Sequence, residues 1–521
     1  MIRVSIADQG GVPAGGRGQE GAGPADASPL CRATLSALSP RIEVPAFDRD
    51  RARPGVVHLG VGGFHRAHMA RYTHDFMRHG AGGSAWGIIG AGLRTADEPL
   101  LAALKAQDCL YTLIERDETQ ARARVIGSLL GVIPAADDAR EVLEAIDRPG
   151  IAIVSLTVTQ AGYGIDNGTR KLDCSRPEIA HDLAHPARPR SAVGVLTAAY
   201  ARRRAAGRPA FTALSCDNIQ HNGSVLREAV VALAMRQDPG LAQWIAEHGA
   251  FPNSMVDRIT PASTAADRAW LEDTYALRDA CPVVCEPFSQ WVIEDRFPAG
   301  RPAWETVGAQ WVEDVTPYEF MKLRLLNATH LAICAPGQLM GFRYVHEAVR
   351  DVRISRLAHA LMRRETGPTV PAPAGIDLGQ YQRAVVRRFG NPLIADTTER
   401  VNTDASLNYL LDPLRDCLDA GRPAPALSFA VAAWIRRSTG RDDAGRSLPV
   451  SNPTATAFET HAARSRRDIE SMLWHRETFG DLGERASFRM QVGRWLRQME
   501  LEGTAGALAA LLEETGTVEF S

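Results

Sequence analysis

Three side chains in the stretch "PYEFMKLRLLNATHLAICAPG" could together transfer protons and hydrogen-bond a ligand: Lys322, Asn327 and His330. On a helix with about 100° per residue, Asn327 lies about 140° and His330 about 80° from Lys322, within one sector of the surface. Burying such a group is costly, because a desolvated ammonium loses its hydration, and the convergence therefore indicates a functional site. The alternative is a lysine on a solvated face with two polar neighbours, and the spacing alone leaves both open.

Polar residues also stand where two predicted strands end. Asp217 and Asn218 end the strand in "FTALSCDNIQHNG", and Thr157, Thr159 and Gln160 end the strand in "SLTVTQAGYG". Ligands of open α/β sheets bind at the carboxyl ends of the strands. We therefore expect these residues near a bound ligand.

The stretch "VVHLGVGGFHRAH" has the order of a dinucleotide loop: an apolar strand, then Gly60-x-Gly62-Gly63, then a helix. Glycines let the backbone N–H groups approach a pyrophosphate, and a helix N-terminus favours its negative charge. His65 stands where the third glycine would be. His65 and His68 could instead bind a metal, although no carboxylate lies nearby, or they could cap and pack the loop.

The next predicted strand, "GIIGAG", leads into "LRTADE". Asp97 or Glu98 could accept hydrogen bonds from a ribose hydroxyl, although they lie farther from Gly60 than the usual interval of about twenty residues. A carboxylate there repels a 2′-phosphate and favours NAD, whereas Arg94 could attract that phosphate. NAD is the expected cofactor, with NADP not excluded.

The composition excludes several classes of protein. Of the 521 residues, 45% are hydrophobic and 23% are charged, and a formal net charge of −2 argues against a nucleic-acid binder. No apolar run is long enough to span a bilayer, and the N-terminus lacks the apolar core of a signal peptide. The eight cysteines form neither a disulfide framework nor a zinc-type set. We expect a cytoplasmic protein with reduced thiols and a small-molecule substrate, and no nucleic-acid or membrane partner.

The pattern along the chain predicts two domains. Short apolar runs alternate with helix-like stretches up to about residue 250, which is typical of a parallel sheet with crossover helices. Long helical patterns with few strand candidates follow. We expect a nucleotide-binding α/β domain at 41–250 and a mostly helical domain at 251–521. Residues 1–40 are rich in Gly, Ala and Pro, and we expect them to be a disordered extension.

Six motifs together carry a resemblance to a known family. "GVGGFHRAH", "TVTQAGYG", "SCDNIQHNG", "NSMVDRITP", "EPFSQWVIED" and "KLRLLNATH" occur in the order found in the polyol-specific long-chain dehydrogenases, which include mannitol 2-dehydrogenases and fructuronate and tagaturonate reductases. The resemblance covers nearly the whole chain from about residue 40. It implies a zinc-independent NAD(P)-linked oxidoreductase, often a monomer, with a Rossmann-type doubly wound sheet followed by a mostly helical domain.

The resemblance also implies roles for single residues. Lys322 matches the general base, Asn218 and Asn327 match the amides that hold the reacting oxygen, and His330 matches the histidine that orients the substrate. The cofactor loop would comprise Gly60, Gly62, Gly63, Phe64, His65 and Arg66, which then need no metal. Asp257 and Arg400 fall where the family contacts the polyol chain. Burial beside amides could lower the pKa of a lysine from about 10.4 to about 7–8 and make it a usable base.

Two positions assigned to substrate binding depart from the family pattern. Gln160 replaces a glutamate, and Asn408 replaces a lysine. Without that lysine, the site lacks a cation that would bind the carboxylate of a uronate, although Arg400 remains. We therefore expect NAD-linked interconversion of a polyol and a ketose, first of all mannitol and fructose. The alternatives are a hexuronate reductase and an arabinitol dehydrogenase.

Overall fold

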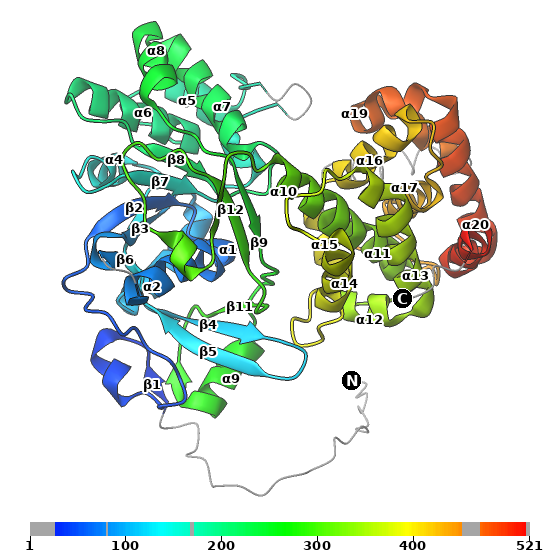
Figure 1. Ribbon diagram of the computed structural model, residues 1–521, viewed down its shortest axis with the longest axis horizontal. Coiled ribbons are helices and arrows are strands. Elements are labelled where there is room, and N and C mark those ends of the chain that lie inside the picture. Colours follow the sequence, from blue (N-terminus) through cyan, green and yellow to red (C-terminus); the bar gives the residue numbers. More distant parts are fainter. Residues whose placement is uncertain (1–26, 80–81, 167–170, 451–468, 517–521) are drawn as a thin grey trace, which may run out of the picture.

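The computed structural model describes residues 27–79, 82–166, 171–450 and 469–516. A sheet-containing half reaches residue 315, and α10 (Thr316–Met321) leads from it into a helical half (Figure 1). Positions 1–26 of the predicted disordered extension lie outside the described residues. Residues 27–40 differ from the prediction, because β1 (Ser28–Pro29) pairs with β10 (Leu277–Arg278) and Leu30 is buried beside it.

The main sheet has five parallel strands in the spatial order β6-β3-β2-β7-β8. Their bounds are Pro54–Leu59 (β2), Gly87–Gly92 (β3), Leu129–Pro134 (β6), Ile153–Leu156 (β7) and Thr212–Ser215 (β8). Numbered along the chain, this order is 3-2-1-4-5, which is the Rossmann order. The order reverses between β2 and β7, and ligands of such sheets bind at that switch point. The predicted α/β class is confirmed.

Helices bury both faces of the sheet. Successive side chains of a strand point to opposite faces, so neighbouring residues of one strand pack in different cores. On β2, Val56 packs in the core that contains α2 and α3, and Val57 packs in the core that contains α4, α6 and α7. The helices of this half are Gly63–Ala67 (α1), Met69–His79 (α2), Glu98–Ala106 (α3), Arg140–Ile146 (α4), Pro177–Ala184 (α5), Ala192–Ala205 (α6), Asn222–Gln237 (α7), Pro239–His248 (α8) and Ala265–Tyr275 (α9).

Residues 251–315 differ from the mostly helical domain that we expected, whereas the described residues after 315 are mostly helical. Residues 251–315 contribute strands to three small sheets: the pair β1-β10 and two sheets of order β11-β4-β5 and β13-β12-β9. Their bounds are Tyr111–Arg116 (β4), Ala121–Ile126 (β5), Ser254–Asp257 (β9), Val283–Cys285 (β11), Gln290–Glu294 (β12) and Gln310–Val312 (β13). The partner of β11 is β4, which lies about 170 residues earlier in the chain, and local periodicity carries no trace of such a pairing.

The helical half surrounds one apolar core, in which α11 and α17 are buried along most of their length. Two segments, η7 (Lys322–Asn327) and η8 (Leu361–Thr366), are π-helical. The α-helices are Ala328–Leu339 (α11), Val345–Arg350 (α12), Val352–Ala360 (α13), Leu378–Phe389 (α14), Thr398–Asp404 (α15), Asn408–Asp419 (α16), Pro425–Arg437 (α17), Arg476–Phe479 (α19) and Ala486–Thr515 (α20). Within the described ranges, no helix is both long and apolar enough to cross a membrane.

Candidate active site

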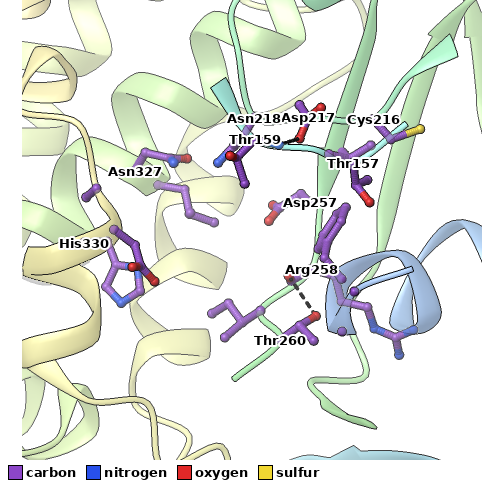
Figure 2. Close-up of a pocket in the computed structure, with 18 of the residues that line it drawn as sticks. Thr157, Thr159, Cys216, Asp217, Asn218, Asp257, Arg258, Thr260, Asn327 and His330 are labelled. Atoms are coloured by element: carbon purple, nitrogen blue, oxygen red, sulfur yellow. Dashed lines mark hydrogen bonds between the residues drawn. The ribbon is translucent and has the colours of Figure 1, made fainter. Parts of the chain in front are cut away.

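A cavity of about 500 Å³ lies between the strand ends of the first half and the helices of the second. Figure 2 shows Asn218, Thr157 and Asp257 on the strand side and Asn327 and His330 on the helical side. The predicted site residues that line it are Gly62, Gly63, Phe64, Asn218, Asp257, Lys322, Asn327, His330 and Arg400. The strand-end residues Thr157, Thr159 and Asp217 line it as well, as expected.

Lys322 is the best-defined group of the cavity. It is the first residue of η7, a π-helical turn of the kind often found at functional sites. Its Nζ donates to Asn218 Oδ1 at 2.5 Å and to the Val256 carbonyl at 2.6 Å. Burial lowers the pKa of Lys322 to about 8, although the nearby carboxylate of Asp257 opposes this shift. Near neutral pH, both the protonated and the neutral form of this amine are therefore populated.

Two amides flank the space in front of this amine. Asn218 uses its Oδ1 to accept from Lys322, which leaves its amide N–H groups as donors for another oxygen. Asn327 Oδ1 is buried and has no hydrogen-bond partner within the part of the chain that the structure describes. A buried acceptor without a partner is costly, and a ligand hydroxyl would satisfy it.

His330 provides a neutral imidazole. Its ring stacks on Phe389 with 4.4 Å between centroids, and its Nε2 lies 3.9 Å from an Asp396 oxygen. Burial lowers the pKa of His330 to about 4, against the opposing effect of Asp396. At pH 7 the ring can therefore donate one hydrogen bond and accept another.

The two residues expected to contact the polyol chain are both paired within the protein. Asp257 accepts two bonds of 2.8 Å from Arg388. Arg400 donates to both oxygens of Asp396, at 2.6 and 2.5 Å. Their charges are compensated, so that they face the cavity as oriented hydrogen-bonding groups rather than as bare ions.

The glycine loop follows the end of β2 at the switch point. Two of its glycines are needed for different physical reasons. Gly60 has φ +94°, and a Cβ there would lie 2.2 Å from the Thr157 carbonyl oxygen. At Gly62, a Cβ would meet no protein atom within 4 Å, and φ is −84°. Gly60 is therefore required by the fold, whereas Gly62 leaves open space where a ligand can approach the backbone.

His65 and Arg66 are not brought to the cavity. His65 is buried and stacks on His58 with 3.4 Å between ring centroids. Arg66 donates to the Cys281 carbonyl, and His68 Nε2 contacts the Gln290 carbonyl at 2.9 Å. Of the three interpretations of this stretch, the packing one fits His65 and His68. Within the described part of the chain, no group of three or more His, Cys, Asp or Glu side chains is placed to bind a metal ion.

Three further predicted residues lie beside the cavity rather than in its wall. Asp97 accepts from Arg94, at 2.7 Å from Nη2, and Arg94 itself lines the cavity. Gln160 and Asn408 line a second cavity of about 480 Å³, which shares Asn218 and Tyr409 with the first. Tyr409 and Arg388 were not predicted from the sequence, because neither lies at a strand end or in one of the six motifs.

The comparisons with known proteins agree with this architecture. The family model described as the mannitol dehydrogenase Rossmann domain matches residues 54–306, and that of the mannitol dehydrogenase C-terminal domain matches residues 314–500. The chain belongs to the mannitol dehydrogenase family. The resemblance seen in the six motifs is thereby confirmed, and the chain is an oxidoreductase.

Individual relatives are similar over almost their full lengths. Mannitol 2-dehydrogenase of Cereibacter sphaeroides is 41% identical over 90% of this chain and 98% of its own. The structure of Pseudomonas fluorescens mannitol 2-dehydrogenase in a ternary complex with NAD and D-mannitol has a TM-score of 0.88 and 40% identity, over 94% of this chain and 100% of that one. A D-sorbitol dehydrogenase in substrate-free form has a TM-score of 0.81 and 35% identity, over 92% and 100%.

Proposed function

We propose that the protein interconverts a polyol and a ketose with NAD(H), first of all D-mannitol and D-fructose, with Lys322 as the general base. The observation that carries this proposal is the buried amine of Lys322, held against Asn218 in a cavity that also contains the open glycine loop. The relative whose complex holds NAD and D-mannitol supports the choice of substrate and cofactor.

Each residue then has a defined task in oxidation. The neutral amine of Lys322 takes the proton of the reacting hydroxyl, and the N–H groups of Asn218 stabilise the oxygen as negative charge develops on it. Asn327 Oδ1 and the neutral ring of His330 fix the orientation of the sugar hydroxyls. When bound, NAD⁺ supplies the hydride acceptor for the carbinol carbon. In ketose reduction the protonated form of Lys322 returns the proton.

The residues at the switch point fit a dinucleotide. Gly62 and Gly63 line the cavity without filling it, and Asp97 follows the C-terminal end of β3, where a ribose hydroxyl is bound in such folds. The Arg94–Asp97 pair favours NAD, because the carboxylate repels a 2′-phosphate and engages the arginine that would attract it. Comparing kcat/KM with NAD⁺ and NADP⁺ tests this preference.

We further propose that the reaction needs no metal ion, because Lys322 and the amides supply the proton acceptor and the polarising groups. Activity should remain unchanged after dialysis against EDTA and 1,10-phenanthroline, followed by assay in metal-free buffer. Loss of activity that added Zn²⁺ restores would contradict this part of the proposal.

The cavity favours a neutral polyol over a uronate. The arginines in its wall each pair with a carboxylate, as Arg94 with Asp97, Arg258 with Glu115, and Arg400 with Asp396. D-Sorbitol is a second candidate, on the ground of the similar sorbitol dehydrogenase. The deciding experiment follows NADH absorbance with D-mannitol, D-sorbitol, D-arabinitol, D-mannonate and the corresponding keto compounds. A kcat/KM for mannonate above that for every polyol would overturn the assignment.

A further inference from the structure

Behind the wall of the cavity, one arginine binds two buried carboxylates. The Arg388 guanidinium donates to both oxygens of Asp257, each at 2.8 Å, and to both oxygens of Glu286, at 2.9 and 2.7 Å. All three side chains are 8% exposed or less. Paired two-pronged contacts of this kind fix the positions of the carboxylates as well as their charge.

The three residues join the two halves of the molecule. Asp257 ends β9 and Glu286 follows β11, both in the sheet-containing half, whereas Arg388 lies on α14 of the helical half. Three residues farther on, Asn391 donates to the Arg116 carbonyl at 2.8 Å, which is a second contact between the halves. Because the cavity lies between these halves, Arg388 is placed to fix their relative position around Lys322.

Asp257 alone would work against a neutral Lys322. Its negative charge favours the protonated amine, and the positive charge of Arg388 opposes this effect. Although burial alone would raise the pKa of Asp257, Arg388 outweighs that effect and keeps the pKa below its ordinary value, so that Asp257 is ionised at neutral pH. Glu319 on α10 also favours the protonated amine, and His68, between α1 and α2, is affected by the charge of Lys322. The wall of the cavity further contains titratable or charged side chains, which are Arg94, Cys216, Asp217, Arg258, His330, Arg400, Asp404 and Tyr409.

We propose that Arg388 is a positioning residue for the reaction: it holds Asp257 in the wall of the cavity across the junction of the two halves, and compensates its charge beside Lys322. Asp257 can then accept a hydrogen bond from the polyol without retaining a proton on the base. This inference rests on the proposed function, in which Lys322 is that base.

The test is the pH profile of kcat/KM for polyol oxidation by the full-length protein. In R388M, the acidic limb of the profile should shift to higher pH by about one unit, because the negative charge of Asp257 is no longer compensated and favours the protonated form of Lys322. In R388K, which keeps the charge, the limb should move less. In the double variant D257N/R388M it should return to the wild-type position or below. R387M, which changes the exposed neighbour on the same helix, is the matched control and should match the wild type.

An R388M profile that coincides with that of the wild type, or a double variant whose limb stays shifted, would overturn the proposal. If R388M does not fold, E286Q provides the test, because removing the competing carboxylate should move the limb to lower pH, and an unmoved limb would contradict the proposal. A second measurement follows the rate at which acetic anhydride acetylates Lys322 as a function of pH, by peptide mass spectrometry. The pKa of Lys322 obtained in this way should show the same shift in the variants without any turnover of substrate. A wild type that is inactive with every polyol would refute the proposed function and with it the role of Arg388 in the reaction, whereas the compensation of Asp257 beside Lys322 would still be tested by the pH dependence of acetylation.

Discussion

Burial has different consequences for the two nitrogen bases of the cavity. It brings the pKa of Lys322 down to about 8, into the range where a proton can be taken and returned, and it brings that of His330 to about 4, where the ring stays neutral throughout. In the proposed function, Lys322 can therefore exchange a proton with the substrate while His330 orients it. Burial lowers both pKa values by a similar amount, from 10.5 for Lys322 and from 6.5 for His330, so the division of tasks follows from the residue types once both are buried.

At the same scale, Asn327 should matter for activity and little for stability. Its Oδ1 has no partner among the described residues, and its other side-chain contact is a single hydrogen bond with Tyr409, so N327L mainly removes a contact that the substrate completes. We expect kcat/KM for mannitol oxidation to fall by about 10²–10³-fold, while Tm stays within about 3 °C of the wild type. Steady-state kinetics and thermal unfolding of the same preparation measure both. A large fall in Tm with unchanged kcat/KM would assign Asn327 to the fold instead.

Among the elements, the loop after β2 offers a matched pair of substitutions. G60A places a Cβ against the Thr157 carbonyl and requires φ +94° of an alanine, which should lower the free energy of unfolding by about 2 kcal/mol or more. G62A meets no protein atom and should leave stability unchanged, but raise the Kd for NADH about tenfold, equivalent to about 1.4 kcal/mol. Denaturant unfolding and NADH fluorescence titration separate the two. Equal effects of both substitutions on stability would contradict this account.

Some elements could be predicted from the sequence and others could not. The strand ends and the glycine loop were predictable, because apolar runs followed by Gly60 or by Asp217 and Asn218 are local signals. The π-helical turn at Lys322 was not, since the spacing of apolar residues in this stretch does not distinguish a π-helical turn from an α-helix. β9 to β13 were missed because they are two to five residues long and several pair with distant segments. Arg388 is one of two adjacent arginines, and only the tertiary structure distinguishes them.

For the molecule as a whole, a buried carboxylate in the helical half should make stability depend on pH. Glu365 accepts the backbone N–H groups of Ala426 and Leu427 at the start of α17, at 2.8 and 2.7 Å. Burial raises its pKa from 4.5 to about 7, although these hydrogen bonds oppose the shift. Between these two values the native state keeps a proton that the unfolded chain releases, so this contribution to stability is lost as pH rises through 7.

E365Q removes this titration. We expect the Tm of E365Q, relative to that of the wild type, to rise as the pH is raised from 5 to 8. Differential scanning calorimetry at several pH values measures the difference. A Tm difference that is constant with pH would show that Glu365 does not titrate in this range.

The most direct measurement is the pH dependence of kcat/KM for mannitol oxidation in the wild type and in K322M. The wild-type value should rise about tenfold per pH unit and level off near pH 8, where Lys322 becomes neutral, while fructose reduction falls over the same range. K322M should be slower by about 10²–10⁴-fold and should lack this limb. A K322M variant that retains the wild-type rate and the same limb would contradict the central role given to this amine.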